Sequence, residues 1–317
     1  DCSLIARING KTLVTPEADV LISSPRFQEI MSQQRRIFDG KSGATYKNTD
    51  KDTLHSGLRT PWIMAGTQAM MDHDQSHLGD RFLRFVIEDP PESEKRAILR
   101  KALRSERVAM LDSVSSTAGS VVDPKTSRAH ALTGGYVDWL RAHVEEELGK
   151  VDVPEKIEDY CIDLAELSAD LRARPNEDRR KVETHETKEL PTRLARQNIR
   201  MASCLAVVLN KLLVDDDVLR IVRKIALDTA IGHSLNIVRW MCSPNPKANY
   251  KLYQESGGLM SQTLEMWSGM TPERMQKYLM FLRKIGVLEW RGAAQSHGAW
   301  ILTERVYDLY LRVMRGA

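Results

Sequence analysis

The chain has 317 residues, of which 42% are hydrophobic and 28% are charged, and its formal net charge is +3. This length leaves room for two domains, and the balance of apolar and charged residues is typical of a globular protein with a sizeable core. The small net charge excludes a chain that attracts nucleic acid over its whole surface, so any such contact must come from a local basic patch.

Cysteine usage and hydropathy limit the compartment. Four cysteines without paired CxxC spacing argue against a zinc site and a disulfide framework, and they predict a reducing, cytoplasmic location. These are Cys2, Cys161, Cys204 and Cys242. No apolar run approaches the length of a membrane span and no signal-peptide pattern opens the chain, so we expect no membrane partner.

Residues 1–91 predict an α/β segment. Residues 11–14 form a short apolar strand, and Glu17 and Asp19 place two carboxylates just beyond it. The alternative for this acidic pair is a solvated strand end. Residues 24–38 have the apolar spacing of an amphipathic helix, which Asp39-Gly40 ends.

The second half of this segment predicts two more strands. The polar stretch 41–56 indicates a hairpin or a long loop, and residues 61–67 form a short buried strand that ends at Thr67. Residues 82–87 form a last strand, and the loop before it carries Arg81. An arginine on a loop after a buried strand is how several ATPases stabilise charge on a transferred phosphoryl group. The alternative is a surface arginine beside a strand.

Residues 92–230 predict a mainly helical segment, a lid or connector domain. Their apolar periodicity and breaking residues define five helices. We expect them over residues 94–111, 133–148, 157–173, 190–213 and 215–229.

Residues 231–317 predict a helix followed by a winged helix. After a helix over 231–241 and a proline-rich break, the pattern is helix, turn, helix, two strands and a last helix. We expect these elements over 259–266, 271–285, 287–290, 299–303 and 304–314.

The terminal segment carries a local excess of positive charge. Residues 271–317 contain eight Lys or Arg and four Asp or Glu. Lys277, Arg283 and Lys284 lie on the expected recognition helix, and Arg291 lies on the expected wing, so we predict that they bind DNA. A winged helix that contacts only protein partners is the alternative.

Taken together, these pieces resemble the second half of an AAA+ ATPase of the helicase kind, as in the minichromosome maintenance helicases and related phage and plasmid replication ATPases. In that family an acidic pair at a strand end holds the magnesium-bound water, and Glu17 and Asp19 are similar. Thr67 resembles the polar residue that senses the γ-phosphate. Arg81, in Gly79-Asp80-Arg81-Phe82, resembles the arginine that reaches a neighbouring subunit's nucleotide.

The resemblance also implies a second sensor arginine that opens a lid helix, and Arg193 or Arg196 is similar to it. It implies ATP and Mg²⁺ as cofactors, with Asp19 at the metal, DNA as a partner, and a homo-oligomeric ring or arc. The fold it implies is a partial P-loop AAA+ core, a helical lid and a C-terminal winged helix.

One departure concerns the phosphate-binding loop. The chain contains no Gly-x-x-x-x-Gly-Lys-Ser/Thr, and Gly10-Lys11-Thr12 has only its last three letters. Either the loop lies upstream of residue 1 or the chain is a degenerate ATPase, and the first residue being Asp rather than Met favours the first explanation.

The leading expectation is an ATP-driven DNA helicase or translocase of a phage or mobile-element replication system. The alternative is a non-catalytic winged-helix protein, an initiator or regulator, that binds DNA or a partner. His73 and His77, with Asp72 and Asp74 nearby, suggest a metal site, but the sequence favours a role in capping the loop before Arg81. No arrangement of Ser, His and Asp indicates a catalytic triad.

Overall fold

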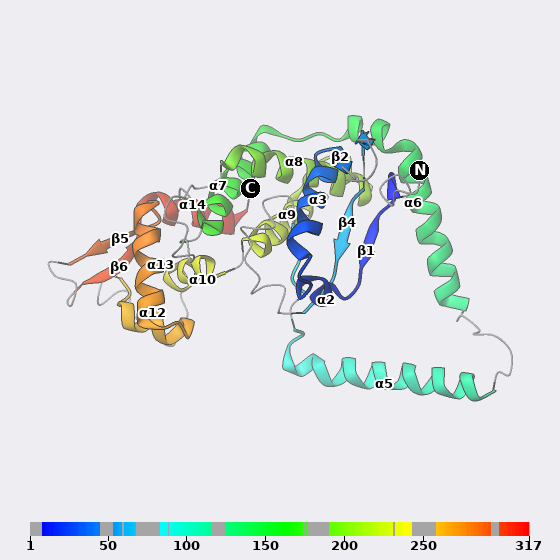
Figure 1. The fold of residues 1–317 in the computed structure, drawn as a ribbon, viewed down its shortest axis with the longest axis horizontal. Helices are drawn as coiled ribbons and strands as arrows, with labels where there is room; N and C mark the ends of the chain where they lie inside the picture. The colour runs from blue at the N-terminus through cyan, green and yellow to red at the C-terminus, as the bar shows by residue number, and fades with distance from the viewer. Residues whose placement is uncertain are drawn as a thin grey trace. The chain divides into compact units, whose positions relative to one another are not determined.

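The computed structural model describes residues 8–44, 53–58, 60–67, 83–87, 89–115, 124–173, 175, 190–230, 232–242, 258–292 and 298–316. These residues are mostly helical, with three two-stranded sheets (Figure 1). The chain divides into two compact units. The first comprises Asp1–Arg84, Ser168–Glu189 and Thr229–Tyr307, and the second comprises Phe85–Leu167, Leu190–Asp228 and Asp308–Ala317.

A parallel strand pair organises the α/β part of the first unit. Strand β1 (Leu13–Thr15) pairs with β4 (Trp62–Met64), with Leu13 opposite Trp62 and Thr15 opposite Met64. Parallel strands need a crossover connection, and here it contains α2 (Ala18–Ile22) and α3 (Phe27–Phe38). Phe27 and Met31 of α3 are buried and pack against Trp62 of β4.

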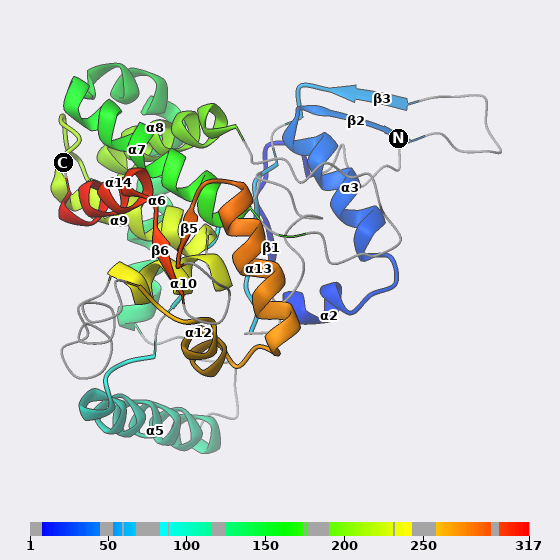
Figure 2. The same cartoon turned by 90° about the vertical axis from the view of Figure 1, so that its left-hand side faces the viewer.

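The same crossover contains the predicted hairpin. Strands β2 (Lys41–Ala44) and β3 (Thr53–Ser56) pair antiparallel, which confirms the hairpin over the long-loop alternative, and Figure 2 shows them following α3. Gly40 joins α3 to β2 with a φ of 75°, a backbone conformation that glycine adopts at little cost. Leu58 N donates to the Gly40 carbonyl and closes the base of the hairpin.

The helices of residues 92–230 follow the predicted periodicity, with shifted ends. They are α5 (Glu92–Ser115), α6 (Pro124–Lys150), α7 (Glu155–Arg172), α8 (Pro191–Val208) and α9 (Asp216–Thr229). Residues from α7, α8 and α9 form the buried core of the second unit, among them Ile157, Leu164, Ala202, Val218 and Val222.

Helix α8 ends five residues before the sequence prediction. Asn210 adopts a φ of 54°, and Lys211 N donates to the Ala206 carbonyl at 2.8 Å. A left-handed residue with such a backward bond is a common helix C-cap, so the backbone leaves the helix here although the apolar pattern continues.

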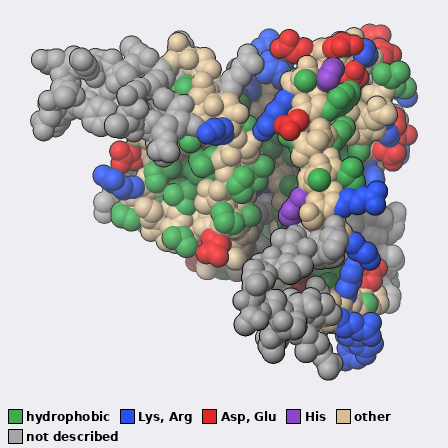
Figure 3. Space-filling model, turned by 90° about the vertical axis from the view of Figure 1, so that its right-hand side faces the viewer, with side chains coloured by type: hydrophobic (Ala, Val, Ile, Leu, Met, Phe, Trp, Pro, Cys, Tyr) green, Lys and Arg blue, Asp and Glu red, His purple; other side chains and the backbone are tan. Residues whose placement is uncertain are grey.

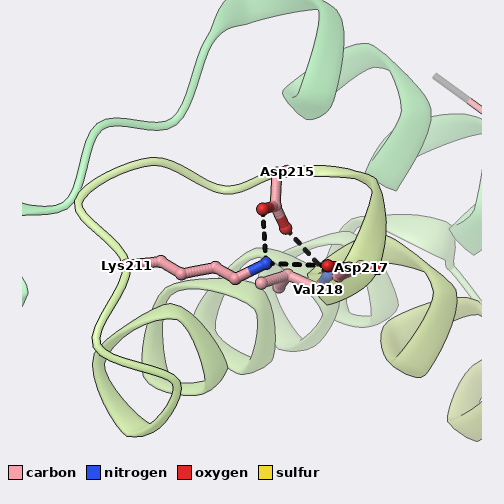
Figure 4. A network of polar contacts seen from close by, with 4 residues as sticks. All are labelled: Lys211, Asp215, Asp217 and Val218. Carbon is pink, nitrogen blue, oxygen red and sulfur yellow. Dashed lines mark hydrogen bonds and ion pairs between the residues drawn. The ribbon is translucent and has the colours of Figure 1, made fainter.

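The loop between α8 and α9 is held by a charged cluster (Figure 4). Lys211 Nζ donates to both Asp215 and Asp217, and Asp215 Oδ1 accepts the Val218 amide at 3.1 Å. The hydrogen bond from Lys211 is the main reason that the pKa of Asp215 lies below its usual value. Asp215 thereby caps α9, and we assign the cluster a structural role.

The prediction of a strand over residues 82–87 is wrong for residues 83–87, the part of it that the structure describes. These residues pair with none of the described strands. The backbone amides of two alternate residues donate hydrogen bonds to side chains instead. Arg84 N donates to Thr229 Oγ1 at 2.9 Å, and Val86 N donates to Asp228 Oδ2 at 2.8 Å. The end of α9 therefore supplies the acceptors that a neighbouring strand would otherwise provide.

The C-terminal segment has the predicted order of elements. They are α10 (His233–Cys242), α12 (Ser261–Ser268), α13 (Pro272–Lys284), the antiparallel pair β5 (Leu288–Arg291) and β6 (Ala299–Leu302), and α14 (Glu304–Arg315). Helix α12 starts two residues later than predicted because Leu259 forms an antiparallel bridge with Trp300 of β6.

Capping residues define the turn between α12 and α13. Gly269 ends α12 with a φ of 66°, and the Thr271 side chain accepts a hydrogen bond from Arg274 N at the start of α13. Buried side chains from α13, β5 and α14 then form the local core, including Met275, Leu279, Leu282, Leu288 and Val306.

Candidate functional site

Two predicted site residues meet beyond the carboxyl ends of β1 and β4. Thr67 N donates to Asp19 Oδ2 at 2.8 Å, and Thr67 Oγ1 donates to Asp19 Oδ1 at 3.1 Å, although the residues are 48 positions apart. Two backbone bonds lock the register at this edge: Ala65 N donates to the Thr15 carbonyl and Ala18 N donates to the Ala65 carbonyl. Ligands of open α/β folds bind at this edge of a parallel sheet.

The two predicted carboxylates have different surroundings. Asp19 lies in the first turn of α2, and both of its oxygens accept hydrogen bonds from Thr67. Glu17 occupies the position before the helix, is exposed, and makes no capping bond with its side chain. Asp19 is thus held in place, whereas the Glu17 carboxylate is open to water and to a ligand.

This pair fits only one kind of magnesium site. Among the described residues, no group of three or more His, Cys, Asp or Glu side chains is arranged to hold a metal ion. At nucleotide sites, however, Mg²⁺ takes one or two carboxylates and completes its shell with phosphate oxygens and water. Glu17 and Asp19 supply two carboxylates of that kind, and they do not form a protein-only cage.

Of the arginines predicted at the nucleotide site, the structure describes Arg193 and Arg196. Arg81 lies outside the described residues, as do His73 and His77. Arg193 and Arg196 lie on α8 in the second unit, where Arg193 is half-buried and Arg196 is exposed. Their roles at a nucleotide stay predictions.

Three of the four predicted DNA-contact residues lie on the solvent side of α13. Lys277, Arg283 and Lys284 are exposed, and Arg291 is exposed at the end of β5. The opposite side of α13 packs into the local core through Met275, Tyr278, Leu279, Phe281 and Leu282. Sequence reasoning missed Arg274, which is also exposed in the first turn; its position three residues before Lys277 was the available signal.

Two cysteines and the serine of α8 that the sequence offers as nucleophiles are not activated. Burial raises the pKa of the Cys161 thiol to about 11 and that of Cys242 to about 12, so neither forms a thiolate at neutral pH. Ser203 Oγ donates to the Ile199 carbonyl one turn earlier in α8.

The search for related proteins gave no match: no family model matches the chain, and no curated protein is significantly similar to it. None of the described helices combines the length and the apolar character that crossing a bilayer requires.

Proposed function

We propose that this protein is an ATP-driven DNA helicase or translocase-type ATPase of the AAA+ class, which acts as an oligomer in the cytoplasm in a phage or mobile-element replication system. The contact between Asp19 and Thr67 beyond two parallel strands carries the proposal.

In this proposal the residues at the strand ends have separate roles. Glu17 accepts a proton from the attacking water, because its carboxylate is exposed and has no capping bond. Asp19 orients Thr67, whose hydroxyl and amide lie at the edge where a γ-phosphate would be bound. Bound Mg²⁺ would supply charge neutralisation on the phosphates. Arg81 from a neighbouring subunit completes the site, and Arg193 or Arg196 reports nucleotide binding from the lid.

Glu17→Gln in the full-length protein tests these roles. We expect ATP turnover to fall about 100-fold with little change in nucleotide affinity, because the amide cannot accept the proton. Turnover is measured by phosphate release, and affinity is measured by the fluorescence of a labelled nucleotide.

A matched control replaces an exposed carboxylate away from the strand ends. Glu29→Gln on α3 removes one charge whose only described ion pair is an exposed contact with Arg26, so we expect unchanged turnover. Wild-type turnover in the Glu17→Gln protein would remove Glu17 from the site.

We further propose that α12, α13, the β5–β6 hairpin and α14 form a winged helix that binds DNA, with α13 as the recognition helix. The exposed cations of α13 support this role, and they are Arg274, Lys277, Arg283 and Lys284. They also support the second candidate, a non-catalytic DNA- or partner-binding protein. DNA binding without ATP hydrolysis by the full-length protein would select that candidate.

Replacing both Lys277 and Arg283 with alanine should weaken DNA binding and flatten its salt dependence. Each phosphate contact contributes about 0.9 to the slope of log K against log salt on duplex DNA, so we expect the slope to fall by about 2. Fluorescence anisotropy of a labelled duplex across a salt series measures it.

The control is Arg128→Ala with Arg220→Ala, which removes two exposed cations from α6 and α9. Its slope should match that of the wild type. An unchanged slope in the α13 variant would exclude this helix from DNA contact.

A further inference from the structure

Helix α5 carries a row of arginines on one side. Arg96, Arg100 and Arg104 follow one another at intervals of four residues, and Lys101 lies beside them. All four side chains are exposed. With a rise of 1.5 Å per residue, successive arginines of the row are about 6 Å apart along the helix. The row therefore presents a line of evenly spaced positive charges.

These charges are not neutralised within the described part of the chain. Lys95, at the start of the row, pairs with Glu92 at 3.2 Å and with Asp89 at 3.6 Å. Arg96, Arg100, Lys101 and Arg104 form no ion pair with any described residue, and the sequence has no Asp or Glu between positions 95 and 105. Four like charges kept together without partners favour an anionic ligand with repeated charges.

Apolar side chains of α5 are exposed as well. Ile98, Leu99 and Leu103 are 50%, 61% and 65% exposed. An exposed basic helix suits either a nucleic-acid backbone or an anionic membrane surface. Two features favour nucleic acid: α5 contains no aromatic residue to anchor it at a lipid interface, and its row is made of arginines, whose planar fork binds phosphate oxygens in pairs.

We propose that the arginine row of α5 binds the phosphate backbone of nucleic acid, at a second contact site besides α13. Figure 3 shows Lys and Arg side chains at the lower right of the view, in the region that includes α5. The inference goes beyond the proposed function and requires neither ATP hydrolysis nor a DNA-binding winged helix.

The test replaces Arg96, Arg100 and Arg104 with glutamine in the full-length protein and measures binding to labelled single-stranded and duplex DNA without nucleotide, across a salt series. The loss of three phosphate contacts should lower the slope of log K against log salt by about 2 to 3. The same measurement in the Lys277→Ala, Arg283→Ala background separates the two sites, because independent contacts lower the slope additively.

Two matched variants control for charge and for folding. Lysine at the same three positions keeps the charge and should keep most of the slope. Glutamine at Arg36, Arg128 and Arg220 removes three exposed charges from other helices and should leave the slope unchanged.

An unchanged slope in the α5 glutamine variant would overturn the proposal, as would an equal loss in the dispersed control or in the lysine variant. Vesicles of equal parts phosphatidylserine and phosphatidylcholine test the membrane alternative. If the α5 glutamine variant loses vesicle binding and keeps its DNA slope, the row is a membrane contact and the proposal is wrong.

Discussion

Replacing Arg81 with alanine in the full-length protein is expected to lower DNA-stimulated ATP hydrolysis by about 1,000-fold or more. An arginine that reaches into a neighbouring subunit's site stabilises charge on the transferred phosphoryl group. Such residues raise kcat by factors of about 10³ to 10⁵. Nucleotide affinity should change little, because this stabilisation acts mainly in the transition state. Phosphate release with and without DNA, beside nucleotide binding, measures both quantities.

Mixing experiments then show whether Arg81 acts between subunits. An Arg81→Ala subunit keeps its own Glu17, and a Glu17→Gln subunit keeps its own Arg81. Where Arg81 acts in trans, mixed oligomers of these two inactive proteins contain some complete sites and recover part of the activity. Recovery of no activity, in oligomers shown to be mixed, would mean that Arg81 does not act on its neighbour.

Arg36→Ala serves as the matched control because Arg36 is an exposed arginine at the end of α3 in the same α/β part of the chain. Its turnover should equal that of the wild type. Full turnover in Arg81→Ala would withdraw the arginine-finger role and with it the main reason to expect an oligomeric ATPase.

The second large effect is expected at a buried charge. Asp170 on α7 is fully buried, and its Oδ2 accepts a hydrogen bond from Arg305 of α14 at 2.7 Å. Replacing Arg305 with glutamine leaves a buried carboxylate without its arginine, which costs several kcal/mol in fully buried pairs. Since the Arg305 side chain is 47% exposed, we expect a smaller loss of about 2 kcal/mol.

Hydrogen exchange measures this loss where it occurs. Protection of the amides of α14 should fall about 30-fold in Arg305→Gln, because 1.4 kcal/mol corresponds to a tenfold change. The double variant Asp170→Asn with Arg305→Gln removes the buried charge as well and should recover part of the protection.

The Arg312–Asp163 pair provides the contrast. Arg312 Nε donates to Asp163 at 2.7 Å, but the two side chains are 57% and 25% exposed, so Arg312→Gln should cost at most about 1 kcal/mol. If Arg312→Gln reduced protection as much as Arg305→Gln, burial would not be what makes the Asp170 pair important.

The sequence alone was sufficient for elements that depend on local order. Apolar spacing located the described helices other than α2, and Thr271 and Pro272 marked the start of α13. Capping residues and the 3.6-residue period act within a few positions of the chain, so they can be read without knowing the rest of the fold. The same local signals placed Glu17, Asp19 and Thr67 at strand ends.

Only the tertiary structure decided which of these residues meet. The two hydrogen bonds between Asp19 and Thr67 depend on the register of β1 against β4, and residues 83–87 bond side chains at the end of α9 instead of another strand. Nothing local distinguishes Asp170, which is buried against Arg305, from the exposed aspartates. Such contacts join segments far apart in sequence, and their free energy depends on burial and packing that the whole chain creates.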